Sequence, residues 1–173
     1  MRLTLFRHAK SAWADAGLDD FDRPLNKRGQ AAAVTMAHAM TAAEILPSLI
    51  LCSAAQRARE TLAHALPIFR GDCRVEIEHG LYLASADTLL DRLHTIQSTE
   101  TDILLIGHNP GLQELALFLA KRAETDAYRN LAAKFPTAAL AQIEFRASHW
   151  TGLKRNAGRL HRFLTPRALG RDG

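Results

Sequence analysis

The sequence predicts a three-layer α/β/α fold with a mostly parallel central sheet. Short apolar runs of strand length alternate along the chain with longer segments whose apolar residues recur at helical spacing. Repeated strand-then-helix units of this kind build a sheet that helices cover on both faces. With 173 residues, 47% of them hydrophobic, the chain can form one substantial core. We expect a single domain over residues 1–173, with a flexible tail after about residue 166.

The first half of the chain predicts three strands and two helices. The strands are expected at residues 3–6, 49–52 and 75–77. An alanine-rich helix is expected over residues 30–45, with Asn26 as its N-cap and Pro47 stopping it. Ser53 is expected to open a second helix that ends near Leu66.

The second half of the chain continues the alternation. Its strands are expected at residues 102–106, 138–145 and 160–164. An amphipathic helix is expected over residues 87–96, where four apolar side chains recur at helical spacing. Another helix, with a strongly apolar face, is expected over residues 111–119.

The charge balance disfavours a nucleic-acid partner. Lysine and arginine number 22 against 18 aspartate and glutamate, which gives a mild net charge of +4. A nucleic-acid-binding domain usually combines a basic stripe with stacking aromatic residues. Here most of the two Trp, two Tyr and seven Phe residues fall within apolar patterns. The positive excess better suits a pocket for phosphorylated, acidic substrates.

The chain shows no sign of a membrane segment or an export signal. No apolar run approaches the roughly 20 residues that span a bilayer, and the first run is too short for a signal peptide. Cys52 and Cys73 form neither a C-x-x-C pair nor a zinc spacing, so reduced thiols are expected. We therefore expect a soluble, cytoplasmic protein without a membrane partner.

Two histidines directly follow expected strands and point to phosphoryl chemistry. Arg7 and His8 come at the end of the first strand, and His108 lies in a Gly-His-Asn-Pro-Gly turn after a later one. In an open α/β sheet, ligands bind outside the carboxyl ends of the strands. A neutral imidazole can attack phosphorus. The guanidinium of Arg7 disfavours the imidazolium form of His8 and also attracts the phosphate.

Arg57 and His108 complete the expected phosphate site. Arg57 comes just after the second strand, and its fork of N–H donors matches phosphate oxygens. Arg59, by contrast, is expected to be an exposed helical residue that pairs with Glu60 or solvent. Gly107 lets the backbone approach closely before His108, and we expect His108 to hydrogen-bond the transferring phosphoryl group.

Lys10 and Ser11 follow His8 in a loop at the same edge of the expected sheet. Loops at this edge usually carry functional residues, so one of the two is expected to touch the substrate. The alternative for both is a solvated loop residue near the site.

Other phosphate chemistries fit the sequence less well. Four residues separate Cys52 from Arg57, whereas cysteine-dependent phosphatases have five. Asp20-Phe21-Asp22 has the Asp-x-Asp of aspartate-nucleophile phosphatases, but no apolar strand precedes it. The chain has no Gly-rich Walker loop and no His-Glu-x-x-His motif. We therefore expect a site without metal or cofactor.

Five stretches of the chain, taken in order and spacing, resemble a known family. They are residues 5–11, 22–29, 53–61, 81–82 and 107–111. The chain resembles the histidine phosphatase superfamily, with its phosphoglycerate-mutase-like fold, and more narrowly the small SixA-type phosphohistidine phosphatases. By that resemblance His8 would be the nucleophile that is transiently phosphorylated. Arg7, Arg57 and His108 would make up the rest of the phosphate pocket.

The chain departs from the larger members of that family. Ala9 replaces the glycine after the histidine, and Ala14 stands near the place of an asparagine that contacts phosphate. The larger members also carry a carboxylate that protonates the leaving alkoxide; Glu78 and Asp87 are the candidates here. Imidazole is a better leaving group than an alkoxide, so phosphohistidine needs less proton donation.

We expect a metal-free phosphatase that hydrolyses phosphohistidine in a protein through a phosphohistidine intermediate on His8. Only eight residues lead from Leu81 to the helix at Leu89, which leaves little chain for a lid over a small molecule. One alternative is a small-molecule phosphomonoesterase of the same fold, with a carboxylate near Glu78 as its acid. The other is a non-catalytic module that binds phosphate.

Overall fold

The computed structural model describes residues 1–12, 17–97 and 99–170, and these contain a six-stranded sheet. The strands are β1 (Arg2–Arg7), β2 (Leu49–Ser53), β3 (Arg74–Glu78), β4 (Asp102–Gly107), β5 (Leu140–Phe145) and β6 (Gly158–Leu164). Their order is β3-β2-β4-β1-β5-β6; the first four are parallel, and β5 and β6 are each antiparallel to their neighbours. The predicted mostly parallel sheet is confirmed. Ala14 and the last three residues of the tail lie outside the described residues.

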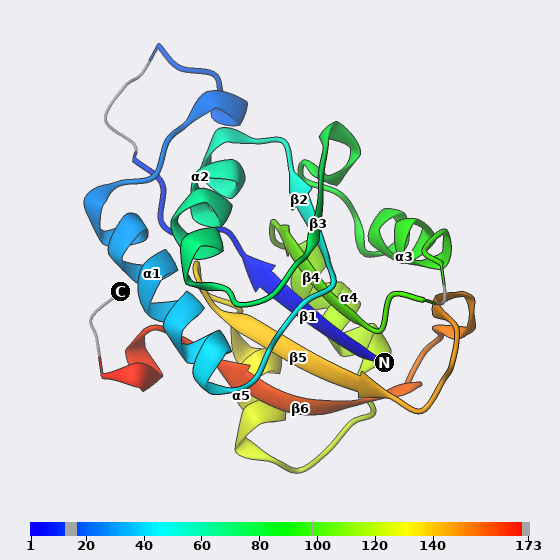
Figure 1. The fold of residues 1–173 in the computed structure, drawn as a ribbon. Coiled ribbons are helices and arrows are strands. Elements are labelled where there is room, and N and C mark those ends of the chain that lie inside the picture. Colours follow the sequence, from blue (N-terminus) through cyan, green and yellow to red (C-terminus); the bar gives the residue numbers. More distant parts are fainter. Residues whose placement is uncertain (13–16, 98, 171–173) are drawn as a thin grey trace.

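Helices cover both faces of this sheet. The helices are α1 (Lys27–Ala42), α2 (Gln56–Ala65), α3 (Ala86–His94), α4 (Gly111–Leu119) and α5 (Asp126–Ala133). One core cluster joins α1 and α2 to one face, and a second joins α3, α4 and α5 to the other (Figure 1). The predicted three-layer α/β/α architecture is therefore confirmed. None of the described helices is long and apolar enough to cross a membrane.

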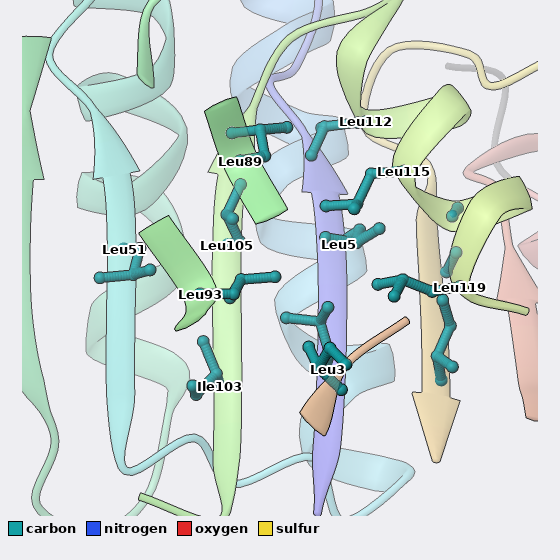
Figure 2. Packing of buried hydrophobic residues seen from close by; sticks show 14 of the residues in the cluster. Leu3, Leu5, Leu51, Leu89, Leu93, Ile103, Leu105, Leu112, Leu115 and Leu119 are labelled. Carbon is teal, nitrogen blue, oxygen red and sulfur yellow. The ribbon is translucent and has the colours of Figure 1, made fainter. Parts of the chain in front are cut away.

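The central strands are rich in apolar residues because both of their faces are covered. In β1 and β4, Leu3, Leu5, Ile103 and Leu105 pack toward α3 and α4, where Figure 2 shows them beside leucines of both helices. Their neighbours along each strand, such as Phe6 and Ile106, pack toward α1 and α2. Successive side chains of a strand point to opposite faces, so an unbroken apolar run fills both cores.

The register of β1 against β4 fixes the position of the two histidines. Arg7 lies opposite Gly107, and the His8 N–H donates a 3.0 Å hydrogen bond to the Gly107 carbonyl oxygen. His8 and His108 are therefore the next residues of two neighbouring parallel strands. They leave the sheet side by side at its carboxyl edge.

Three details of the elements differ from the sequence predictions. Helix α5 was not predicted, because residues 126–133 form a short segment in which only Leu131 is buried. Helix α1 ends at Ala42 rather than at residue 45, since Glu44 adopts a left-handed conformation with φ of 54°. Ser53 does not cap α2: it is the last residue of β2, and Ala55 precedes the helix without a side-chain cap.

Candidate active site

A pocket of about 320 Å³ opens at the carboxyl edge of the sheet. Its described lining includes four cationic side chains, namely Arg7, Lys10, Arg23 and Arg57, and one carboxylate, that of Asp20. The remaining lining residues are His8, Ser11, Leu83, His108, Asn109 and Thr137. The structure thus brings together all six residues that the sequence singles out for the site. The excess of positive charge favours a multiply charged anion.

The ring of His8 is oriented by its own loop. His8 Nδ1 lies 2.8 Å from the Ala9 carbonyl oxygen. A carbonyl oxygen only accepts, so Nδ1 carries the proton and Nε2 keeps a free lone pair. This tautomer is the one that a nucleophilic imidazole requires.

Burial keeps His8 neutral. The side chain is buried, and the pKa of His8 is lowered to about 3. Burial is the main cause of this lowering, and the positive charges of Arg57 and Arg7 add to it, while the bond to Ala9 opposes it. From the sequence, Arg7 is expected to keep this ring neutral, but in the structure Arg7 makes only a minor contribution to the lowered pKa of His8.

His108 is held by the end of the neighbouring strand. Its Nε2 lies 2.8 Å from Ser53 Oγ, and its ring centroid is 5.0 Å from that of His8. Ser53 Oγ also accepts the Ala55 N–H at 3.3 Å. Burial and then Arg57 lower the pKa of His108 to about 4, which keeps this ring neutral at pH 7 as well.

The two arginines reach the pocket from different elements. Arg7 is the last residue of β1; its Nη1 donates to the Phe135 carbonyl oxygen at 2.7 Å. Its buried Nε has no hydrogen-bond partner among the described residues. Arg57 lies in the first turn of α2 and is buried, with Nη2 3.5 Å from His108 Nδ1. An unsatisfied buried donor beside a second guanidinium indicates a place for an anion.

Thr61 ties the nucleophile loop to the helix of Arg57. Its buried Oγ1 accepts the Ala9 N–H at 2.9 Å and donates to the Arg57 carbonyl oxygen at 2.6 Å. One hydroxyl therefore links the residue after His8 to the residue that would hold the phosphate. This contact gives a structural role to Thr61, the last residue of the stretch over residues 53–61 that resembles the family.

Lys10 and Ser11 both line the pocket, as the sequence predicts for residues of this loop. Lys10 is exposed, whereas Ser11 is buried and its hydroxyl accepts a 2.9 Å hydrogen bond from Arg23 Nη2. Arg59 points away from the pocket on the exposed side of α2. The partners of the Glu60 carboxylate are instead Leu25 N at 2.7 Å and Gln56 Nε2 at 2.8 Å.

Among the site residues that sequence reasoning missed, Asp20 and Tyr82 make the closest contacts with Arg57 and His108. Asp20 lies in a 3-10 turn (Asp20–Asp22), and its carboxylate contacts Arg57 Nη2 at 2.9 Å. The Tyr82 hydroxyl donates to the same carboxylate at 2.7 Å, and the Tyr82 ring packs edge-on against His108. These contacts join residues 37 and 62 positions apart in the chain, so local spacing does not predict them, although Tyr82 lies in one of the five stretches that resemble the family.

The two candidate acids suggested by the sequence do not reach the pocket. Glu78 accepts hydrogen bonds of 2.8 to 3.0 Å from Arg92, and neither Glu78 nor the exposed Asp87 lines the site. The close backbone approach attributed to Gly107 occurs at Gly111 instead. A Cβ on Gly111 would lie 2.0 Å from the Ala84 carbonyl oxygen, whereas on Gly107 it would meet only leucine side chains at 3.4 Å or more.

Within the described ranges, no group of three or more His, Cys, Asp or Glu side chains is arranged to hold a metal ion. Cys52 and Cys73 are both free, and Cys52 is buried beneath the sheet edge. The pocket presents imidazole, guanidinium, ammonium, hydroxyl and amide groups, together with the carboxylate of Asp20, to a ligand.

Comparisons with known sequences identify the family to which the chain belongs. Residues 3–82 match the family model of the histidine phosphatase superfamily, branch 1. An uncharacterized protein of Mycobacterium tuberculosis is 35% identical over 163 residues, covering 93% of this chain and 99% of that protein. An uncharacterized chloroplastic protein of Arabidopsis thaliana is 34% identical over 133 residues, covering 69% of this chain and 59% of that one.

Solved structures agree with the sequence comparisons. A SixA protein of Agrobacterium tumefaciens, assigned as a phosphohistidine phosphatase, superposes with a TM-score of 0.79 at 32% identity, covering 95% of this chain and 97% of that chain. The protein histidine phosphatase SixA in complex with tungstate shares the fold, with a TM-score of 0.79 at 21% identity, and covers 98% and 99% of the two chains. The chain belongs to the histidine phosphatase superfamily and is a SixA-type member of it.

Proposed function

We propose that this phosphatase hydrolyses phosphohistidine on proteins, with His8 as the nucleophile and without a metal ion. The observation that carries the proposal is the fixed tautomer of His8. Nδ1 is committed to the Ala9 carbonyl oxygen at 2.8 Å, so the lone pair of Nε2 is available in a pocket with Arg7 and Arg57.

The first step transfers the phosphoryl group to His8. Nε2 attacks phosphorus, the bond from phosphorus to the substrate imidazole breaks, and that imidazole takes up a proton from solvent. The His8 ring becomes positive as the new P–N bond forms, and the Ala9 carbonyl oxygen stabilises that charge. Arg7, Arg57 and His108 donate to the phosphoryl oxygens, which stabilises the charge that they carry in the transition state.

The second step releases phosphate. Water attacks phosphorus on the side that the substrate imidazole has left, the P–Nε2 bond breaks, and the water proton passes to solvent. His8 returns to its neutral form because burial strongly disfavours the imidazolium. Hydrolysis of one phosphohistidine thus yields one histidine and one inorganic phosphate.

The carboxylates in and near the pocket favour phosphohistidine over a phosphate ester as the substrate. An alkoxide leaving group needs an acid, but Glu78 is held by Arg92 outside the pocket. Asp20 lines the pocket, but its pKa is lowered to about 2, first by the hydrogen bond from Tyr82. An ionised carboxylate has no proton to donate at neutral pH, whereas imidazole leaves with less assistance.

The proposal places the reaction in the cytoplasm, where both free thiols would stay reduced. It assigns the protein a phosphorylated protein as partner, and neither nucleic acid nor membrane. The name of the similar Agrobacterium protein supports this substrate class for the present chain.

The test compares phosphate release from a phosphohistidine protein and from p-nitrophenyl phosphate, with chelator present. Wild type should turn over the phosphohistidine far faster than the ester, and His8→Ala should abolish both. Arg57→Ala should lose activity by at least about a hundredfold, as expected for a donor to transition-state charge. Arg59→Ala is the matched control, because it removes an exposed arginine from the same helix, and it should retain full activity.

The other outcomes identify the alternatives. A preference for the ester would indicate a small-molecule phosphomonoesterase with the same nucleophile. If wild type turns over neither substrate and His8→Ala binds a phosphopeptide as tightly as wild type, the protein is a phosphate-binding module.

A further inference from the structure

The carboxylate of Asp20 binds the guanidinium of Arg57, which in the proposed function binds the phosphoryl group. Asp20 Oδ2 accepts a 2.9 Å hydrogen bond from Arg57 Nη2, and the Asp20 backbone carbonyl accepts another from Arg57 Nη1. The Arg57 side chain is 5% exposed, whereas that of Asp20 is 46% exposed. Arg57 is therefore fixed within the pocket, and Asp20 reaches it from the rim.

Asp20 has two further partners that do not depend on Arg57. Its Oδ1 accepts a 2.8 Å hydrogen bond from Arg23 Nη1, and its Oδ2 accepts the Tyr82 hydroxyl at 2.7 Å. A carboxylate with these donors can turn away from Arg57 and stay hydrogen-bonded. The contact with Arg57 can thus be given up without leaving Asp20 unsatisfied.

A phosphoryl group needs the donors that Asp20 uses. Phosphate and carboxylate oxygens bind a guanidinium in the same way, through short, charge-assisted bonds to its N–H groups. A phosphoryl dianion beside an ionised carboxylate is also repelled by it. The two anions therefore cannot both bind Arg57 favourably.

We propose that Asp20 is an internal competitor of the phosphoryl group for Arg57, displaced when substrate binds and restored when phosphate leaves. This inference rests on the proposed function for the position of the phosphoryl group. It goes further by assigning to Asp20 the control of phosphate affinity. Asp20 is then a positioning residue that weakens phosphate binding to the free pocket and favours product release.

The experiment measures the Kd of inorganic phosphate by calorimetric titration at fixed ionic strength. Asp20→Asn keeps the shape of the side chain and removes its charge, so it should bind phosphate about tenfold more tightly, which corresponds to about 1.4 kcal/mol. Asp22→Asn is the matched control: Asp22 is exposed in the same 3-10 turn and does not line the pocket, so this variant should leave Kd unchanged.

Steady-state kinetics add an independent readout. Asp20→Asn should lower the KM for p-nitrophenyl phosphate without raising kcat, because substrate and product both bind more tightly. If Asp20 only supported the position of Arg57, its replacement would weaken phosphate binding and raise KM. Equal or weaker phosphate binding by Asp20→Asn therefore overturns the proposal. Asp20→Ala, checked for an unchanged melting temperature, repeats the test without an amide at the site.

A double-variant cycle locates the competition. In an Arg57→Ala background, adding Asp20→Asn should change the Kd of phosphate much less than tenfold, because only the direct repulsion by the carboxylate remains. A tenfold gain that persists without Arg57 would show a general effect of charge and would overturn competition at this residue. Phosphate binding can be measured without turnover. A wild-type protein that hydrolyses neither substrate would refute the proposed function, but the phosphate titration would still decide whether Asp20 competes for Arg57.

Discussion

The imidazole rings of His8 and His108 lie with their centroids 5.0 Å apart and their planes tilted by 50°. Each ring is held through one nitrogen, His8 by the Ala9 carbonyl oxygen and His108 by the Ser53 hydroxyl. Two neutral imidazoles beside a pocket that holds four cationic side chains form a site for a phosphoryl group. The consequences of this arrangement can be measured.

The two rings should remain neutral far below the usual pKa of histidine. With the pKa of His8 lowered to about 3 and that of His108 to about 4, neither ring should titrate between pH 8 and pH 5. Nitrogen-15 NMR of the free enzyme checks this and should show His8 protonated at Nδ1 alone. A His8 signal that titrates near pH 6.5 would contradict the prediction.

The same depressed values predict a loss of stability in acid. Below about pH 6.5 the unfolded chain takes up protons at these two histidines while the folded chain does not. Their contribution to stability is therefore complete above that pH and falls progressively toward pH 4. Urea unfolding of His8→Ala at pH 7 and pH 4.5 should show a smaller difference between the two pH values than wild type shows.

Ser53→Ala should reduce activity through His108. The substitution removes the hydroxyl that lies 2.8 Å from His108 Nε2, so the ring loses the contact that fixes its orientation. Loss of one hydrogen bond of this kind predicts a fall of roughly tenfold in kcat. Ser48→Ala is the control. Ser48 lies just before the other end of β2, where its hydroxyl donates to Glu100, so the loss of this hydroxyl should leave kcat unchanged. Equal kcat values for the two variants would exclude the role of Ser53.

Gly29→Ala should disturb the loop that carries Lys10. A Cβ at Gly29 would lie 2.1 Å from the Lys10 carbonyl oxygen, so helix α1 and this loop would have to separate. We expect a loss of about 1–3 kcal/mol in the free energy of unfolding, together with a higher KM. Gly152→Ala meets only the Ala147 Cβ at 3.8 Å and should change neither quantity. A Gly29→Ala protein as stable as wild type would show that the loop adjusts freely.

Asp102→Asn should stabilise the protein at neutral pH. Asp102 is buried at the start of β4, and burial raises its pKa to about 6 despite the salt bridge from Arg2 at 2.6 Å. The folded chain therefore holds this proton more tightly than the unfolded chain, so stability falls as the pH rises from about 4 to above 6. At pH 7 the variant should be more stable than wild type by about 2 kcal/mol, and at pH 4 the two should be nearly equal. Denaturant unfolding at both pH values decides this, and a variant less stable at pH 7 would contradict it.

Much of the fold can be predicted from the sequence because it depends on local patterns. Unbroken apolar runs such as residues 103–106 predict strands that are covered on both faces, and helical spacing over residues 111–119 matches the bounds of α4. Helix α5 was not predicted in this way, because it is only eight residues long and buries a single side chain, that of Leu131.

The sequence by itself determined the positions of His8 and His108, since each comes directly after an apolar strand and parallel strands end at one edge of a sheet. Only the tertiary structure decided which other groups reach them. Asp20 contacts Arg57, which is 37 residues away in the chain, and Tyr82, which is 62 residues away. These contacts depend on loops whose course local spacing does not specify. It also decided the charge of the rings, because the desolvation that keeps both imidazoles neutral depends on how much of the folded chain surrounds them.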